Sequence, residues 1–311
     1  MIGYILRRLL LGVPILLGVT FITFFLLNVF GGDPVAARLG KSASPEDLAA
    51  LRAKHGLDQP LPAQYFRYLG EIARFDFGRS FLTDEPVRQI LGRSIGPSLS
   101  ITLPALVLTT LVSLTIASIA AAYRGRFIDR ALMALAVLGM SVSFLVYIVA
   151  GQHFLAYKAG VFQIHGYSTG IFERIEYLLL PILISVIVGT GYDVRFYRAA
   201  IVEEADRLHV KTAKAKGLAP STVMRRHVLR NSLIPIITRI MISVPFLITG
   251  SLLLEVYFGI PGLGSKVLGA LNEQDYPVIK AVTVMVSFLF ILGNVLTDVL
   301  YSWADPRVRL D

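Results

Sequence analysis

The sequence contains no cysteine and little charge. None of its 311 residues is Cys, and Asp, Glu, Lys and Arg together make up 16% of the chain, against roughly a quarter in an average soluble protein. The absence of cysteine excludes disulfides, thiolate nucleophiles and zinc–thiolate sites. Hydrophobic residues make up 55% of the chain, so the composition excludes a disordered basic tail and indicates a membrane protein with several spans.

The sequence also lacks the motifs of several enzyme classes. In the stretch nearest to a phosphate-binding P-loop, Gly259–Lys266, Ser265 precedes Lys266, whereas a P-loop needs the Lys first. There is no HExxH helix and no GxSxG nucleophile elbow. The five histidines form no close pair at metal-ligand spacing, and His153 and His165 are interpreted as surface residues in preference to contacts with a substrate metal. We therefore expect no enzymatic activity and no bound cofactor or metal in this chain.

Apolar runs predict the membrane topology, because a helix needs roughly 20 apolar residues to cross a bilayer. Six runs meet or approach this length: 9–30, 98–122, 131–152, 177–194, 235–256 and 278–302. The first run is too long for the hydrophobic part of a signal peptide, so we interpret it as an uncleaved span. The predicted fold is an all-α polytopic membrane bundle of six transmembrane helices.

Basic residues in the loops predict the orientation of this bundle. Sixteen Lys and Arg fall in four segments on one side, which are 1–8, 123–130, 195–234 and 303–311. The short loops on the other side, 153–176 and 257–277, hold only three. We therefore expect both termini in the cytoplasm, and we attribute the net charge of +9 to this orientation in preference to nucleic-acid binding.

The long segment 31–97 is predicted to lie outside the cytoplasm and to be helical. Ser44 followed by Pro45 predicts a helix start, and Gly56 predicts its end. A second helix is expected over 63–74, with an apolar stripe formed by Tyr65, Phe66, Leu69, Ile72 and Ala73. Two interpretations stay open for this segment: a packed cap over the bundle, or a docking surface for an external partner.

The segment 195–234 carries nine basic and three acidic residues. Strong helix formers predict a helix over 196–216, Gly217 predicts its end, and Pro220 opens another helix that reaches about Asn231. A solvated hairpin, an anionic-lipid patch and a nucleic-acid patch would each explain the charge. None of them explains the small residues in the run, which suit close docking of another surface and are Thr212, Ala213, Ala215 and Gly217.

Ionisable residues at membrane depth are candidates for function. The five in this chain all lie near predicted span ends: Asp193, Arg239, Glu255, Lys280 and Asp298. This placement gives little support to a proton relay and hence to secondary transport. A buried Asp298 would need a partner, for which Arg239 is the candidate.

Ordered motifs resemble one family across nearly the whole chain. The run KTAKAKGL at 211–218, followed by RHVLRNSLIP at 226–235, is similar to the cytoplasmic loop of ABC importer permease subunits of the oligopeptide, dipeptide and nickel branch. Lys211 and Arg230 stand where the broader superfamily has Glu and Pro, and both fit this branch. Further matches are Gly32-Asp33-Pro34, Gly56-Leu57-Asp58-Gln59-Pro60, Asp76-Phe77-Gly78-Arg79-Ser80, the run 255–264, Asp298 with Tyr301, and Asp305-Pro306-Arg307 with Arg309.

The resemblance implies a type I ABC importer permease fold in a bacterial or archaeal inner membrane. It implies an N-terminal tip and first span (1–30), an extracytoplasmic helical segment (31–97) and a core permease domain (98–311). The expected partners are a second homologous permease, two cytoplasmic ATPases that bind ATP and Mg²⁺, and an extracytoplasmic substrate-binding protein, with no nucleic acid. Short peptides are the expected substrates, and nickel chelates, glutathione and opine-like compounds remain alternatives, because 153–176 matches no motif.

The resemblance also implies two sets of site residues. Those expected to couple the chain to an ATPase are Lys211, Thr212, Ala213, Lys214, Ala215, Lys216, Gly217, Leu218, Arg225, Arg226 and His227. Those expected at the gate or on the binding-protein side are Glu255, Pro261, Gly262 and Gly264. A stand-alone secondary transporter and a membrane enzyme or anchor are the rival hypotheses, and neither explains the ordered motifs.

Overall fold

The computed structural model describes residues 2–32, 35 and 44–304, and its regular structure is helical. The motif residues Asp33, Pro34, Asp305, Pro306, Arg307 and Arg309 lie outside the described residues. The helices are α1 (Ile2–Val29), α3 (Pro45–His55), α4 (Leu61–Ala73), α5 (Val87–Ala122), α6 (Phe127–Ser141), α7 (Phe144–Ala150), the π-helical η1 (Gly151–Lys158), α8 (Ile171–Ala205), α9 (Leu208–Ala215), α10 (Pro220–Thr222), the π-helical η2 (Val223–Leu229), α11 (Arg230–Thr249), α12 (Leu252–Tyr257), α13 (Leu263–Asn272) and α14 (Tyr276–Ala304). The predicted all-α fold is confirmed.

Five helices in the described chain are long and apolar enough to cross a membrane. They are Leu6–Val29, Val87–Ala122, Phe172–Ala205, Pro220–Pro245 and Tyr276–Leu300. The pair Phe127–Ser141 and Phe144–Lys158 is bent by 87° and makes a sixth span if it is counted as one. The six predicted spans therefore agree with the higher of the two counts.

Helix boundaries differ from the predicted spans where a helix continues past its apolar stretch. The second span begins at Val87, not at residue 98, and the fourth continues to Ala205, not to 194. Residues 87–97 were not expected to be helical and begin α5, whereas the helix expected from residue 196 is continuous with the fourth span in α8. Hydropathy marks the part of a helix that suits a bilayer, whereas the backbone hydrogen bonds continue until a residue breaks them.

The prediction of one continuous fifth span over 235–256 was wrong. Its helix begins at Pro220, runs through η2 and α11, and ends at Thr249. Gly250 then takes a left-handed conformation with φ +73°, which glycine adopts without a steric penalty. Ser251 is extended, and the short helix α12 follows.

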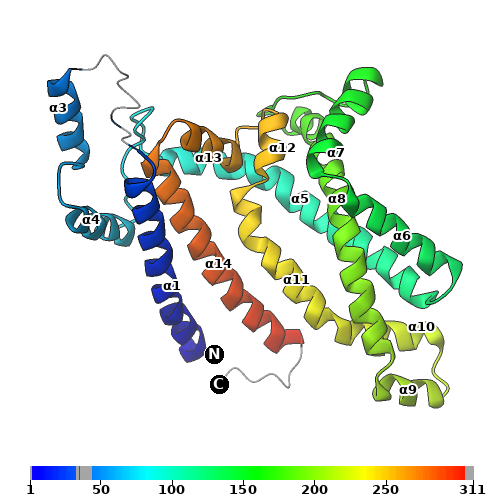
Figure 1. Cartoon of the computed structure of the whole chain (residues 1–311). Helices are drawn as coiled ribbons and strands as arrows, with labels where there is room; N and C mark the ends of the chain where they lie inside the picture. The colour runs from blue at the N-terminus through cyan, green and yellow to red at the C-terminus, as the bar shows by residue number, and fades with distance from the viewer. Residues whose placement is uncertain (1, 33–34, 36–43, 305–311) are drawn as a thin grey trace.

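The helices form a bundle with two distinct ends (Figure 1). α1 packs against α14, α14 packs against α11, and α5 crosses the bundle and packs most extensively against α8. The start of α1, the last turn of α14 and the short helix α9 lie at one end, called the α9 end. The helices α3, α4, α12 and α13 lie at the opposite end, called the α13 end.

The segment before α5 is attached to the α13 end of the bundle. The predicted cap of α3 is confirmed, since the Ser44 hydroxyl accepts a hydrogen bond from Asp47 N at 3.1 Å, and Gly56 ends the helix with φ +61°. Ser80 donates to the buried Asp275 carboxylate, which also accepts from Phe81 N at 2.9 Å. These bonds fix residues 76–84 to the start of α14.

Two ion pairs within the bundle correct the predicted pairing of Asp298 with Arg239. Arg239 Nε lies 2.9 Å from Asp193 Oδ1, and Arg8 Nε lies 3.1 Å from Asp298 Oδ2. Because α8 continues past residue 194, Asp193 lies inside that helix and beside α11. Asp298 lies in the last turns of α14, next to the start of α1.

Candidate functional site

The most prominent feature of the α9 end is a helix–turn–helix that projects from the long helix α8 (Figure 1). The helix predicted over 196–216 is broken, because α8 ends at Ala205 and Arg207 is extended, with ψ 152°. α9 then ends where Gly217 takes φ +77°, and the chain returns through α10 and η2 toward α11. The predicted stop at Gly217 is confirmed.

One side of α9 is packed and the other is exposed. Val210 and Ala213 are buried against Val223 and Val228 in an apolar cluster that also holds Tyr197. Ala213 is 4% exposed, so within this chain it packs the turn and does not face outward. His227 is half-buried, and the other predicted coupling residues are exposed: Lys211, Thr212, Lys214, Ala215, Lys216, Gly217, Leu218, Arg225 and Arg226.

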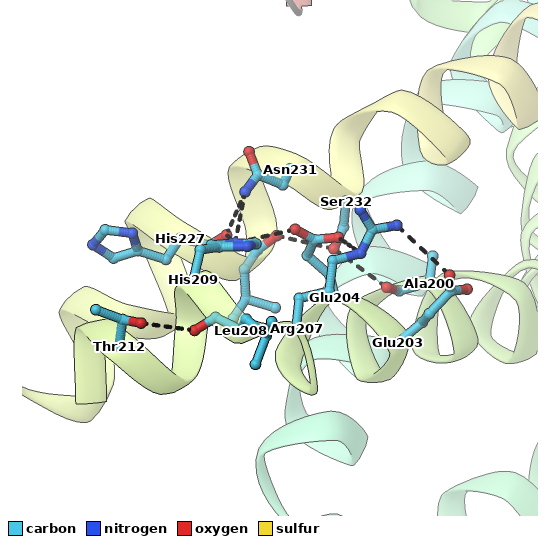
Figure 2. Close-up of polar contacts among 11 residues, drawn as sticks. Ala200, Glu203, Glu204, Arg207, Leu208, His209, Thr212, His227, Asn231 and Ser232 are labelled. Carbon is cyan, nitrogen blue, oxygen red and sulfur yellow. Dashed lines mark hydrogen bonds and ion pairs between the residues drawn. The ribbon is translucent and has the colours of Figure 1, made fainter. Parts of the chain in front are cut away.

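A buried carboxylate holds α9 against α8 and α11 (Figure 2). Glu204 Oε2 lies 2.9 Å from Arg207 Nε, and Glu204 Oε1 lies 3.2 Å from His209 Nε2. The same His209 nitrogen is 3.0 Å from Asn231 Nδ2, which donates to the His227 carbonyl at 3.0 Å. Glu204, Arg207, His209 and Asn231, here called the Glu204 clamp, fix the angle at which α9 leaves α8.

A cavity of about 840 Å³ lies beside the Glu204 clamp. Its lining comes from α8, α9, η2 and α11 and includes Glu203, Arg226 and Arg230. The α9 end therefore combines a convex helix with an adjacent hollow, which is a shape suited to contact with another protein.

A second polar cluster surrounds Glu255 at the α13 end. The Glu255 side chain is 0% exposed. Its Oε1 accepts from the Ser98 hydroxyl at 2.7 Å, and its Oε2 accepts from Ser265 N at 2.9 Å. Ser98 Oγ in turn accepts from Leu263 N at 2.8 Å. The first N–H groups of a helix lack partners within the helix, so Ser98 and Glu255 together cap the start of α13.

Electrostatic and steric features of this cluster agree with that capping role. Burial raises the pKa of the Glu255 carboxyl, while hydrogen bonds from Ser98, Ser265 N and Gly264 N act in the opposite direction. A Cβ at Gly250 or at Gly262 would overlap the Glu255 carboxylate, and one at Gly264 would lie 2.8 Å from Leu252 Cα. Glycine is thus required here for close approach.

The structure brings together three of the four predicted gate residues. Glu255, Gly262 and Gly264 share one cluster, whereas Pro261 is exposed. His153 and His165 were interpreted as surface residues, and both are exposed. The ring of His153 stacks on that of Tyr157, with 5.9 Å between their centroids. Within the described residues, no group of three or more His, Asp and Glu is arranged to hold a metal ion.

Comparison with known proteins decides the family. Residues 113–310 match the family described as binding-protein-dependent transport system inner membrane component, and residues 1–102 match its N-terminal region. The chain belongs to this family of permeases. The permease is the membrane component of an ABC importer, a multi-pass protein of the inner membrane, and not itself catalytic. A system of this kind includes a binding protein and ABC partners.

Relatives match the permease along its whole length. A putative peptide transport system permease protein of Brucella abortus is 35% identical over 315 residues and 100% of both chains. A probable peptide ABC transporter permease protein of Sinorhizobium fredii is 33% identical, over 98% of this chain and 99% of the relative. A glutathione transport system permease protein of Salmonella paratyphi A is 33% identical over 99% of both chains.

Sequence reasoning missed several residues that the permease uses to build the two clusters. Glu204 belongs to the run 203–206, Glu-Glu-Ala-Asp. This run superficially resembles the EAA motif of the family's cytoplasmic loop, but it lies too far before Gly217 to fill that role. A partial signal was present, because Arg207 follows Glu204 three residues later, whereas His209 is five residues away and meets Glu204 only because α8 ends at Ala205. Ser98 and Gly250 carried no sequence signal that relates them to Glu255.

The end of α8 nearest to α9 has a second support in this permease, formed with the first turn of α6. Arg198 donates from Nε and Nη2 to the two oxygens of Asp129, at 2.5 and 2.6 Å. Asp129 Oδ2 also accepts from Gly125 N at 2.8 Å. An exposed pair lies nearby and joins the loop before α6 to the residue that follows α8, since Arg124 Nη1 lies 2.7 Å from Asp206 Oδ2.

Asp129→Asn is expected to lower the midpoint of thermal inactivation of the permease by roughly 5 °C or more. The Asp129 carboxylate is 4% exposed, and its loss leaves the partly buried Arg198 cation without a counter-charge. Asp206→Asn breaks the exposed pair with Arg124, and it is expected to change the midpoint little, because solvent screens such pairs. Size-exclusion thermostability in detergent measures both, and equal midpoints for the two variants would contradict the assignment.

Proposed function

We propose that this permease carries short peptides across the inner membrane. The support is the named substrate of its relatives, which are described as permeases for peptides or for glutathione. Glutathione is itself a tripeptide, so it is a specific candidate within the class. The translocation path is proposed to form between this permease and a second, homologous one, with substrate delivered by a binding protein.

The helix–turn–helix made of α9, α10 and η2, here called the α9 element, is proposed to couple the permease to an ATPase. The single observation that carries this role is the construction of α9 itself: a short helix packed on one side through Val210 and Ala213, with exposed Lys211 and Lys214 on the other. Basic residues on such a surface steer and orient docking more than they add affinity. Because the Glu204 clamp fixes α9 to α8, a displacement of α9 is passed to the span.

The α9 end is proposed to face the cytoplasm, and both termini with it. The segments at this end carry most of the loop Lys and Arg, as the positive-inside rule requires of cytoplasmic loops. With this orientation, the transport cycle is driven from the cytoplasmic side. Two ATPases close when they bind ATP with Mg²⁺, and their closure moves the paired α9 elements and turns the two bundles from inward-facing to outward-facing.

The function is tested by uptake into proteoliposomes. The tagged permease is purified with the subunits that accompany it, and uptake of a labelled dipeptide is measured with ATP on the α9 side and binding protein on the other. Uptake is expected only when both are present, and an ion gradient alone is expected to drive none. Accumulation driven by the gradient, with the permease alone, would instead identify a secondary transporter.

The same preparation distinguishes the substrates. Unlabelled tripeptide, glutathione and a nickel chelate are added as competitors of the labelled dipeptide. Competition by the tripeptide is expected. Competition by glutathione in addition would show that the substrates include γ-linked as well as α-linked small peptides. A nickel chelate that competes while peptides do not would contradict the proposed substrate.

A further inference from the structure

The short helix α4 presents an apolar side away from the protein. The residues exposed on it include Leu61, Pro62, Ala63, Phe66, Gly70 and Ala73. Its polar residue Gln64 is buried and donates to the carbonyls of Leu57 and Gln59 at 3.2 and 2.7 Å. On the inner side of α4, Tyr68 and Ile72 pack against Phe24. The helix thus carries apolar residues on both sides, whereas a surface helix in water keeps its outer side polar.

The two charged residues of α4 have partners within the permease, although their side chains are partly accessible, Arg67 to 39% and Glu71 to 44%. Arg67 and Glu71 line a cavity of about 310 Å³ that α4 forms with residues 76–84 and α14. Arg67 Nη2 donates to the Gly56 carbonyl at 3.0 Å, and its Nε lies 3.8 Å from Glu71 Oε1. Both side chains therefore find partners within the permease.

α4 lies beside the span α1 and not above it (Figure 1). The Tyr65 hydroxyl donates to Leu17 O at 3.2 Å, and the ring of Tyr65 lies 5.3 Å from that of Phe24. Leu17 precedes Val29, the last residue of α1, by 12 residues, which is about 18 Å of helix at 1.5 Å per residue. The apolar part of α1 reaches Val29, so this contact is made well inside the apolar span.

The backbone of α4 is suited to a medium without water, where unpaired polar groups are costly. Pro60 and Pro62 at its start have no N–H group, and Gln64 N donates to Pro60 O at 3.1 Å. At its end, Arg74 N and Asp76 N donate to Glu71 O, and Phe75 N donates to Ile72 O. Several donors and acceptors of the two helix ends are thus absent or paired.

An apolar groove of about 220 Å³ separates the exposed side of α4 from α1. Aromatic rings of both helices line it, including Phe21, Phe25 and Phe66. Asn28, a polar residue in the lining, donates its amide to Phe24 O at 2.8 Å. Phe66 is 71% exposed and Phe21 is 54% exposed, so the groove is continuous with the outward surface of a membrane span.

We propose that α4 is embedded in the membrane leaflet at the α13 end and that the groove between α1 and α4 holds a phospholipid acyl chain. Continuity with the surface of α1 favours lipid as the occupant, because that surface belongs to a span. The position gives the segment before α5 a membrane anchor of its own. This proposal does not depend on which substrate is transported or on the partners proposed for α9.

Fluorescence quenching tests this placement, because the chain has a single Trp, Trp303. In a Trp303→Phe background, Phe66→Trp places an indole on the exposed side of α4. The full chain, with the subunits that purify with it, is reconstituted in nanodiscs whose phospholipids carry brominated acyl chains. The fluorescence of the new indole is taken as the difference from the same complex with Trp303→Phe alone, which subtracts any Trp of the other subunits. The fluorescence is expected to be quenched by these lipids and to be insensitive to iodide in the water.

Matched positions calibrate the measurement. Phe21→Trp on α1 gives the reference for lipid contact, Ala50→Trp on α3 the reference for water, and Tyr68→Trp the reference for a site buried in protein. Quenching by iodide and not by lipid would overturn the proposal by placing α4 in water. Protection from both quenchers would also overturn it, because a second permease or a binding protein would then cover the helix.

Discussion

Gly217→Asp is expected to reduce ATP-driven uptake to the level seen without ATP, while the permease still inserts in normal amount. Gly217 has φ +77°, and a Cβ built on it meets no heavy atom within 4 Å. An L-residue in that conformation costs roughly 1–2 kcal/mol, which a packed turn tolerates. The loss is therefore expected at the surface that docks on α9, where a side chain and a negative charge enter a contact otherwise formed by Lys214, Lys216 and glycine.

Gly160→Asp is the matched control for this variant. Gly160 also has a left-handed conformation, with φ +64°, and also has open space around its Cβ position. It lies after η1 and outside the α9 element, so the backbone strain is similar and the position is different. Uptake and membrane content are measured for both variants in the same proteoliposome assay. Normal uptake by a fully inserted Gly217→Asp permease would contradict the coupling role of α9.

The bundle and the turn at Gly217 could be predicted because their signals are local. Apolar runs, a Ser before a Pro, and a glycine after a helical stretch each act within a few residues. The exact helix ends were harder, since α8 continues past its apolar part to Ala205. The same extension explains the wrong partner for Arg239, because Asp193 was expected at a helix end and lies inside the helix.

The Glu204 clamp and the Glu255 cluster could not be predicted from the sequence, because their partners meet only in the folded chain. Asn231 is 22 residues from His209, and Ser98 is 157 residues from Glu255. The motif around Glu255 identified the region without indicating that its acid is a helix cap. Conversely, Ala213 was expected to face a partner and is buried, because α9 packs two of its positions, 210 and 213, against η2.

Glu255→Ala is expected to remove much of the folded permease from the membrane and to stop uptake. The substitution leaves Ser265 N and Gly264 N buried without their acceptor and the Ser98 hydroxyl without its own. Unpaired buried groups cost about 1–3 kcal/mol each, so the total loss of stability is on the order of 3 kcal/mol or more. Membrane content and thermostability in detergent measure the loss, and a variant as stable as the parent would contradict the capping role.

Ser98→Ala is expected to act on the same unit. Ser98 links the Glu255 carboxylate to Leu263 N, so its removal opens both bonds at once. The double variant Ser98→Ala/Glu255→Ala is therefore expected to lose less stability than the two single losses added together, because residues of one network are not independent. Additive losses would indicate that Ser98 and Glu255 contribute separately to the α13 end.

Gly262→Ala tests the steric part of the same cluster without touching a polar group. Gly262 has φ −91°, which any residue adopts, so the effect of a methyl group there comes from overlap with the Glu255 carboxylate alone. A large loss of stability and of uptake is expected. Gly269→Ala in the same helix is the control, because a Cβ there meets nothing within 4 Å and alanine favours a helix interior by up to about 1 kcal/mol. If both variants kept full stability, α13 would have to move away from Glu255, and the carboxylate would not be the group that holds it.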